Sequence, residues 1–479
     1  MYKIAPGPCQ LLHDSAQTKI LETSCRNTLP AQALMQRAGL ATARLALALA
    51  PHAKTFWIAC GPGNNGGDGL EAAQHLHRWG KFVHASWLGN PGAAPEDART
   101  AYQRAQAAGL TIRNDLPTHC DFCVDALLGI GISRAADGPL RDCIDRINAI
   151  DAPVLSVDLP SGLNGDSGTA SGVHVHALHT LSLLTLKPGL FTAQGRDAAG
   201  QIWFDSLGVS APAQTATALL NGRPPALPRP HASHKGSYGD LAVLGGAAGM
   251  TGAALLAATA ALYQGAGRVF VFLMASDSVL LAPDYPELML RPAESLDAGA
   301  MTLVCGCGAG DAIAQHLPRL LSTAPRLVLD ADALNAIAQD SQLQHLLRAR
   351  SSRGRQTVLT PHPLEAARLL KSTVTEVQSR RLHAASEMAA SFACTVVLKG
   401  SGTVIASPQQ ASVINPTGNA RLATAGTGDV LAGMVGARMS QGEAAFQAAC
   451  AAVWLHGLAA DNWADGQVLT AAALASRRF

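Results

Sequence analysis

Short apolar runs alternate with longer amphipathic stretches along most of the chain. The runs have the length of buried strands and end at small or polar turns; they include residues 55–60, 153–157, 268–274, 303–305, 325–330, 357–361 and 395–399. Segments with apolar residues at helical spacing follow them. This alternation predicts an α/β fold with parallel strands, whose carboxyl ends gather ligand-binding side chains at one edge of a sheet.

The pattern changes between residues 209 and 234, where prolines interrupt the periodicity. We interpret this stretch as a stiff connector, and 479 residues exceed one ordinary hydrophobic core. The sequence therefore predicts two domains, residues 1–216 and residues 217–479. Residues 11–50 predict two helices. The uncharged stretch 241–267 is long enough for a membrane span, but its glycines favour a buried strand, a turn and a small-residue helix.

Composition narrows the classes of function. Apolar residues make up 48% and charged residues 15% of the chain, and the net charge of +2 comes without long Lys/Arg runs, so neither nucleic acid nor a membrane is implied as a partner. The Cys120/Cys123 and Cys305/Cys307 pairs lack further metal ligands nearby, so we expect buried, reduced thiols. The first residues lack the pattern of a secretory signal, and we expect a cytoplasmic protein.

A polar glycine turn follows the first buried strand. Its sequence, GPGNNGGDGL, formally matches the dinucleotide fingerprint, but residues 81–89 lack the expected ribose-binding acid, which disfavours a redox NAD site. Asp125 and Asp158 end two further strands, and Ser161 follows the second. In a parallel sheet these side chains would converge with Asn65 in one crevice. A single such Asp is equally an ordinary helix cap, but the whole set favours a site.

A second glycine turn stands near the C-terminal end of the chain. Gly426, Thr427, Gly428 and Asp429 lead directly into an apolar helical pattern. A helix that opens there directs unpaired N–H groups at an anion, and Asp429 could accept the proton of a hydroxyl that attacks a phosphate. The alternative is a simple turn with Asp429 as the helix cap. The P-loop pattern GxxxxGK[ST] is missing from the sequence.

The first half resembles the N-terminal domain of NAD(P)H-hydrate epimerases, a Rossmann-like three-layer α/β/α fold. LMQRAG, GPGNNGGDGL, VDALLGIGIS, SVDLPSG and LLTLKPGL carry the resemblance. It implies that Asp158 binds the hydrate and is the general acid/base, and that Asn65, Asp125 and Ser161 hold a potassium ion through oxygen ligands. The implied hydrate contacts are Asn64, Asn65, Gly66, Gly67, Asp68, Gly129, Ile130, Gly131, Ile132, Ser133, Arg134, Ala135 and Asp158.

The second half resembles the ADP/ATP-dependent NAD(P)H-hydrate dehydratases of the ribokinase-like superfamily. HKGSYGD, LDADALN, TPHPLE, VVLKGSGTVI and NPTGNARLATAGTGDVLAG carry this resemblance. It implies that Asp429 is the catalytic base and that Mg²⁺ bridges the phosphates of ADP or ATP. The implied anion hole is Gly426, Thr427 and Gly428; the nucleotide contacts are Lys399, Gly400, Ser401, Gly402, Thr403 and Gly428; the hydrate contacts are Ala253, Gly308, His362 and Asp429.

The two halves together resemble bifunctional repair enzymes for hydrated nicotinamide cofactors. The implied substrates are the hydrates of NADH and NADPH with ADP, and we expect a homo-oligomer. Cys307 and Ala309 depart from the family's Gly-Pro-Gly-Leu-Gly turn, and Ala425 replaces a glycine. His362 has a simpler interpretation as a helix-start residue. Two other functions remain open. The chain could be a small-molecule kinase of the hydroxymethylpyrimidine or thiazole type, or its first half could be a binding or scaffolding module without catalytic activity.

Overall fold

The computed structural model describes residues 1–131, 134–275 and 285–477, and in these the chain forms two compact units. One unit comprises residues 1–5 and 11–218, and the other comprises residues 6–10 and 219–479. Residues 6–10 are tied to the second unit by the Arg223 N–H, which donates to the Gly7 carbonyl at 2.7 Å. The sequence boundary alone did not predict this short N-terminal contribution.

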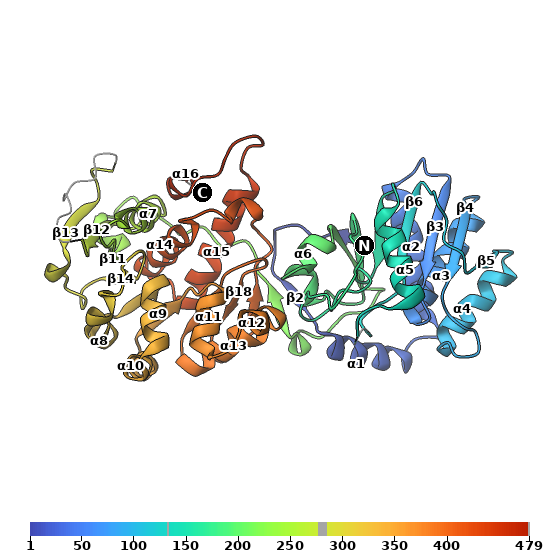
Figure 1. Ribbon diagram of the computed structural model, residues 1–479, viewed down its shortest axis with the longest axis horizontal. Helices are drawn as coiled ribbons and strands as arrows, with labels where there is room; N and C mark the ends of the chain where they lie inside the picture. The colour runs from blue at the N-terminus through green and yellow to red at the C-terminus, as the bar shows by residue number, and fades with distance from the viewer. Residues whose placement is uncertain (132–133, 276–284, 478–479) are drawn as a thin grey trace. The chain divides into compact units, whose positions relative to one another are not determined.

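The first unit is built on a largely parallel sheet (Figure 1). Its strand order is β1 (Tyr2–Lys3), β9 (Gln201–Asp205), β8 (His179–Leu183), β7 (Val154–Val157), β6 (Phe122–Ala126), β3 (Thr55–Cys60), β4 (Phe82–Trp87) and β5 (Ile112–Arg113). Only the β1–β9 pair of this described sheet is antiparallel. Its helices are α1 (Ser15–Arg26), α2 (Ala33–Leu49), α3 (Asn64–Arg78), α4 (Glu96–Ala107), α5 (Gly138–Ala149) and α6 (Gly195–Ala198).

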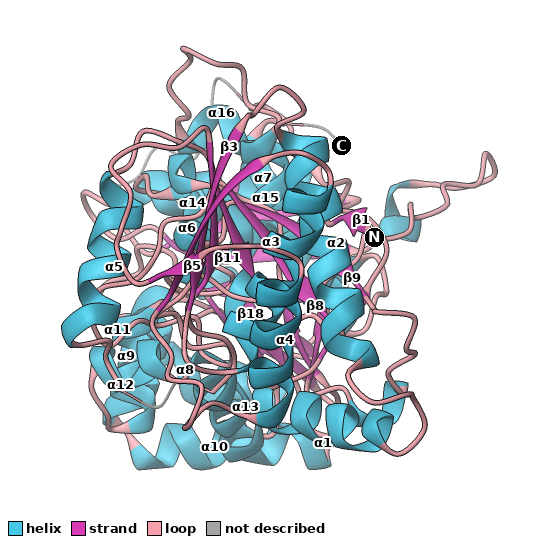
Figure 2. Cartoon of the chain, turned by 90° about the vertical axis from the view of Figure 1, so that its right-hand side faces the viewer, coloured by secondary structure: helices cyan, strands magenta, loops and turns pink. Residues whose placement is uncertain are grey.

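The central strand β3 explains the layers of this unit. Phe56 and Ile58 belong to the core beneath α2 and α3, whereas Trp57 belongs to the opposite core, beneath α5. Successive strand residues point to opposite faces, and each such side chain contributes about 2 kcal/mol by burial, so both faces need helices. Figure 2 shows α5 and α2 on opposite sides of the strands. The predicted three-layer α/β/α arrangement is therefore confirmed.

The second unit has a longer mixed sheet, parallel from β13 through β17. Its order is β13 (Met289–Pro292), β12 (Arg268–Leu273), β11 (Asp240–Gly245), β14 (Thr302–Cys305), β15 (Arg326–Leu329), β16 (Gln356–Leu359), β17 (Thr395–Leu398), β18 (Val404–Ala406) and β19 (Ser412–Ile414). The order continues with β10 (Ala218–Leu220) and β2 (Gln10–Leu12), where the chain passes between the units.

Helices cover this second sheet on two faces. They are α7 (Thr251–Tyr263), α8 (Ile313–Thr323), α9 (Ala331–Gln339), α10 (Ser341–Ser352), α11 (Pro363–Leu370), α12 (Val374–Ser379), α13 (Arg381–Phe392), α14 (Thr427–Ser440), α15 (Ala445–Asp461) and α16 (Ala471–Ala475). The helices α7, α14 and α15 form one packed layer, and α8 to α11 form another (Figure 1). The predicted strand and small-residue helix within residues 241–267 are β11 and α7, and no described helix is long and apolar enough to span a membrane.

Candidate active sites

A cavity of about 660 Å³ opens at the carboxyl ends of β3, β6 and β7 in the first unit. The following predicted hydrate contacts line the cavity: Asn64, Asn65, Asp68, Gly129, Ile130, Gly131 and Asp158. Gly66 is not among the lining residues. Its backbone packs against the Gly61 carbonyl oxygen, with which a Cβ would collide. Arg134 and Ala135 are not among the lining residues, and Ile132 and Ser133 lie outside the described residues.

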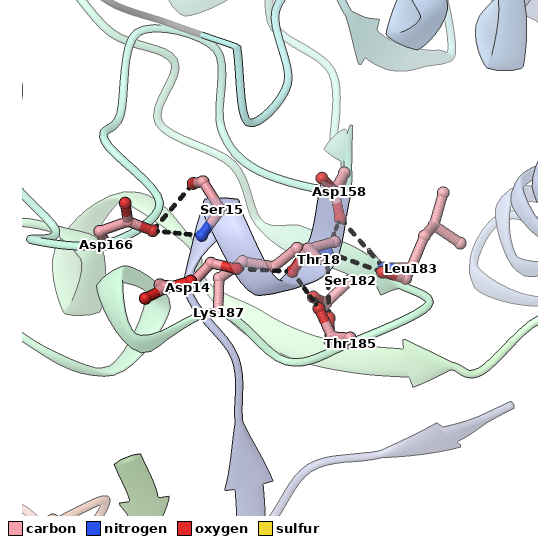
Figure 3. Close-up of polar contacts among 9 residues, drawn as sticks. All are labelled: Asp14, Ser15, Thr18, Asp158, Asp166, Ser182, Leu183, Thr185 and Lys187. Carbon is pink, nitrogen blue, oxygen red and sulfur yellow. Dashed lines mark hydrogen bonds and ion pairs between the residues drawn. The ribbon is translucent and has the colours of Figure 1, made fainter. Parts of the chain in front are cut away.

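Asp158 follows β7 directly and is held by a buried lysine (Figure 3). Its Oδ1 accepts from the Leu183 N–H at 3.1 Å and from the Lys187 ammonium, which is 1% exposed. The ammonium also donates to the carbonyls of Leu183 at 2.7 Å and Thr185 at 3.0 Å. Three donors therefore meet three acceptors, and this arrangement stabilises a charged Asp158 carboxylate at the cavity wall.

Two other carboxyl groups of the cavity have the opposite character. Burial raises the pKa of Asp68 well above its ordinary value, and the charges of Asp158 and Glu22 add to the effect. Burial also raises the pKa of Glu22, again with a contribution from Asp158. Both side chains retain some exposure, toward a cavity that they line. The cavity thus combines a charge-stabilised carboxylate with two carboxyl groups that favour the neutral form.

The residues predicted to hold potassium lie around the turn after β6. The buried Asp125 carboxylate accepts from the Ser161 hydroxyl at 2.5 Å and the Ser161 N–H at 2.9 Å. The Ser161 oxygen accepts from the Leu128 N–H at 2.8 Å, and Asn65 lies against Gly129. The Asn65 side-chain nitrogen is buried without a partner among the described residues. Since amide O and N assignments are interchangeable, this unsatisfied amide fits an oxygen ligand for a cation.

The second candidate site lies at the N-terminus of α14. Gly426 precedes the helix with φ 90°, and a Cβ there would lie 2.7 Å from Leu256 Cδ1, so glycine is required on both counts. Asp429 lies in the first turn of α14, not at its cap, which excludes its interpretation as the capping residue. The Thr427 N–H donates to the Thr424 carbonyl at 3.4 Å, and the Gly428 N–H that follows it lies at a helix start beside a carboxylate.

Three side chains from different strand ends converge on Asp429. Ligand atoms of Cys307, Asp330 and Asp429 all lie within 4.8 Å of one another. The Lys399 ammonium contacts Asp330 Oδ1 at 2.7 Å, and a Cβ on Gly428 would lie 3.3 Å from that ammonium. Burial, and next the charge of Asp330, raises the pKa of Asp429 to about 6, while Lys399 and the Cys307 thiol lower it. The site therefore combines a base that is ionised at neutral pH with a cation at the helix start.

The predicted hydrate contacts of this unit are partly assembled around the same centre. Ala253 at the start of α7 touches Gly308, where a Cβ would lie 2.9 Å from its Cβ. His362 is the N-cap of α11: its Nδ1 accepts from the Leu364 N–H at 3.1 Å, and Glu365 returns a capping bond. His362 thus has the structural role that the simpler interpretation assigned to it. Its side chain is still 46% exposed and is available to a ligand.

The predicted nucleotide loop, residues 399–403, is fixed from beneath by a buried arginine. The Arg381 guanidinium donates to the carbonyls of Leu398 and Lys399 at 3.1 Å each and lies against Gly400, whose φ is 128°. Burial lowers the pKa of Arg381 to about 10, so the group remains charged at neutral pH. The guanidinium group of Arg381 thus bonds two successive backbone carbonyls and fixes the backbone conformation of the loop.

Replacing Arg381 with lysine is expected to raise the KM for ADP about tenfold, the equivalent of one charge-assisted hydrogen bond. The lysine ammonium has no planar fork, so it cannot hold Gln378 through one nitrogen and the Leu398 and Lys399 carbonyls through another. The KM is measured by recovery of reduced-nicotinamide absorbance. Arg380→Lys is the matched control, because the neighbouring side chain is 39% exposed and pairs with Glu376. An unchanged KM in Arg381→Lys would show that the loop holds its shape without the guanidinium.

Several site residues escaped the sequence-based prediction. Lys187 and Asp330 stood within recognised motifs, LLTLKPGL and LDADALN, but nothing marked their side chains as partners of Asp158 and Lys399. Glu22 and Arg381 lie on ordinary helical patterns, where a charged residue normally indicates a solvated face. Cys307 was expected to be a buried, reduced thiol; it is free and buried, as are Cys120, Cys123 and Cys305. Its position beside Asp429 depends on how the strand ends converge.

Comparison with known proteins finds a family match in each half of the chain. A family model described as YjeF-related protein N-terminus matches residues 31–189, and one described as NAD(P)H-hydrate dehydratase matches residues 241–478. The ADP-dependent (S)-NAD(P)H-hydrate dehydratase of Neisseria meningitidis is 46% identical over 51% of this chain and 83% of its own. A crystal structure of the Bacillus subtilis ADP/ATP-dependent NAD(P)H-hydrate dehydratase is 33% identical, covers 52% of this chain and 90% of its own, and has a TM-score of 0.47.

A longer match covers both units together. The bifunctional NAD(P)H-hydrate repair enzyme Nnr of Escherichia coli is 36% identical over 89% of this chain and 84% of its own length. A protein of the same description from Coxiella burnetii is also 36% identical, over 90% of each chain. The resemblance found in the motifs is therefore confirmed over about nine tenths of the chain, and the protein belongs to the family of bifunctional NAD(P)H-hydrate repair enzymes.

Proposed function

We propose that this chain interconverts the R and S hydrates of NADH and NADPH and dehydrates the S form with ADP. We assign the epimerase to residues 1–216 and the dehydratase to residues 217–479. One observation carries the proposal: each unit has its own polar site at the strand ends, one a cavity lined by Asp158 and the other a helix start beside Asp429. A two-step repair needs two such sites.

In the dehydratase, Asp429 accepts the proton of the hydrate's hydroxyl as that oxygen attacks the terminal phosphate of ADP. The N–H groups at Gly426 to Gly428 and the Lys399 ammonium stabilise the charge that develops on the transferred group. Water is a poor leaving group, whereas the phosphate ester leaves readily and restores the reduced ring. When bound, Mg²⁺ would neutralise charge on the nucleotide phosphates, and the Asp330 carboxylate beside Asp429 would be an oxygen donor for it.

In the epimerase, Asp158 is the acid/base group at the hydroxyl-bearing carbon, and the predicted contacts from Asn64 to Asp68 and around Gly129 bind the hydrate. Potassium is proposed at Asn65, Asp125 and Ser161, and its support is the unsatisfied Asn65 amide beside a buried carboxylate and a hydroxyl. When bound, the ion would fix the turn that carries Gly129. We also propose that ADP or ATP is the phosphate donor, and that the chain acts as a homo-oligomer in the cytoplasm.

Incubating the protein with S hydrate, ADP and Mg²⁺ tests the dehydratase. The expected result is stoichiometric recovery of reduced-nicotinamide absorbance with release of AMP and phosphate. A small-molecule kinase shares the anion hole and base but keeps its product, so accumulation of a stable phosphorylated hydrate would contradict the proposal. The same assay with R hydrate tests the epimerase, since that substrate must be inverted first.

A further inference from the structure

The cavity of the first unit contains more acid–base machinery than Asp158 alone. Given the proposed epimerase function, on which this inference rests, inversion at a hydroxyl-bearing carbon needs a proton donor and a proton acceptor. Asp158, which is paired with a lysine ammonium, is the candidate for the acceptor. The other carboxyl groups that line the same cavity are therefore candidates for the donor.

The Lys187 ammonium assigns the acceptor role to Asp158. All its protons are used, on Asp158 Oδ1 and on two backbone carbonyls, so the ammonium fixes one oxygen of the Asp158 carboxylate in place. Lys187 is 1% exposed and Asp158 is 13% exposed. Within the described residues the side-chain hydrogen bonds of Asp158 all use Oδ1, so Oδ2 is the oxygen that can take a proton.

Helix α1 brings Glu22 to the same wall. Figure 3 shows Thr18 of α1 facing Thr185, with their hydroxyl oxygens 2.8 Å apart, and the Thr185 carbonyl is one acceptor of the Lys187 ammonium. Glu22 stands four residues after Thr18, on the same face of α1 and one turn along. The helix start is also fixed, because the Ser15 N–H donates to Asp166 at 2.7 Å. The contact that anchors α1 thus directs Glu22 into the cavity.

Glu22 lies among groups that favour its protonated form. No ion pair or hydrogen bond of the Glu22 or Asp68 side chain is found within the described ranges, whereas Asp158 has the lysine. Burial raises the pKa of Glu22 first, and the Asp158 charge raises it further. The charged groups around Glu22, from α1, α3 and the turns after β7 and β8, are Lys19, Arg26, Asp68, Asp158 and Lys187.

We propose that Glu22 is the proton donor of the epimerase and that Asp158 is the proton acceptor. Glu22 gives its proton to the hydroxyl oxygen as the carbon–oxygen bond breaks, and the bonding pair leaves with the oxygen as water. The ring nitrogen lone pair stabilises the resulting cation. A water molecule forms the new carbon–oxygen bond on the opposite face and passes a proton to Asp158, and proton exchange with solvent restores both groups.

Glu22→Gln tests this assignment, because glutamine keeps the size and polarity of the side chain but has no proton to give. The kcat of R-hydrate repair in the full-length protein is expected to fall about 100-fold, with the KM changed less than threefold. In the wild type the rate should fall at high pH as Glu22 ionises, and this fall should be missing in Glu22→Gln. Glu22→Asp, which keeps a carboxyl group, should recover at least tenfold of the loss.

Asp142→Asn is the control, because Asp142 is exposed on α5 and does not line the cavity. It should repair R hydrate at the wild-type rate, and thermal unfolding should match for all variants. The proposal is overturned if Glu22→Gln keeps the wild-type kcat and pH profile, or if Glu22→Asp is as slow as Glu22→Gln. A wild type that repairs S hydrate but never R hydrate would instead refute the epimerase function itself.

Discussion

Asp429→Asn is expected to abolish the dehydration of S hydrate, with a loss of about 10³- to 10⁴-fold in kcat. The asparagine has nearly the same shape and keeps the start of α14, so helix geometry and nucleotide binding should persist. What disappears is the group that accepts the hydroxyl proton. The interconversion of R and S hydrates, measured by chromatography, should proceed at the wild-type rate because Asp158 and Glu22 are unchanged in this variant.

The pH dependence supplies an independent check on Asp429. Its pKa is raised to about 6, chiefly by burial and then by Asp330, and a base acts only when ionised. The kcat for S hydrate should therefore be level above about pH 7 and should fall as the pH drops below about 6. Asp311→Asn is the control, since this acid lies exposed just after the Gly306–Gly310 turn. A similar loss in both variants would mean that Asp429 is not the base.

The sequence predicted strand-end acids well, because strand periodicity and the parallel arrangement together place Asp125 and Asp158 at one edge. It also distinguished the anion turn at Gly426 from a P-loop. It could not predict which charges pair. Asp330 follows β15 and Lys399 follows β17, and β16 lies between these two strands in the sheet. Whether the two side chains meet therefore depends on the packing of the sheet and its core.

The same limit applies to Glu22 and to residues 6–10. Thr18 and Glu22 follow an ordinary amphipathic pattern, and only the contact with Thr185 shows that this face of α1 meets the cavity. Residues 6–10 join the second unit through backbone pairing with residues beyond 218, which leaves no side-chain pattern to detect. Long-range contacts of this kind are tertiary information, whereas local periodicity determines the elements themselves.

Asp158→Asn is expected to lower R-hydrate repair about 10³-fold while S-hydrate repair persists. Asparagine is a better probe than alanine at this position. Asp158 has φ 68°, in the left-handed region that Asn adopts at a lower cost than Ala, so an alanine variant would add backbone strain to the chemical loss. The measurement is the ratio of R- to S-hydrate turnover in one preparation, which corrects for differences in active protein.

This variant should also destabilise the first unit, by about 3 kcal/mol. Breaking a buried ion pair leaves an uncompensated charge, and the asparagine oxygen offers the Lys187 ammonium only a neutral acceptor. Adding Lys187→Met removes that charge, so the double variant should unfold at a higher denaturant concentration than Asp158→Asn alone. The double variant should remain as inactive toward R hydrate as Asp158→Asn, because it regains stability but still has no proton acceptor. Recovery of epimerisation with recovery of stability would show that Asp158 serves only the fold.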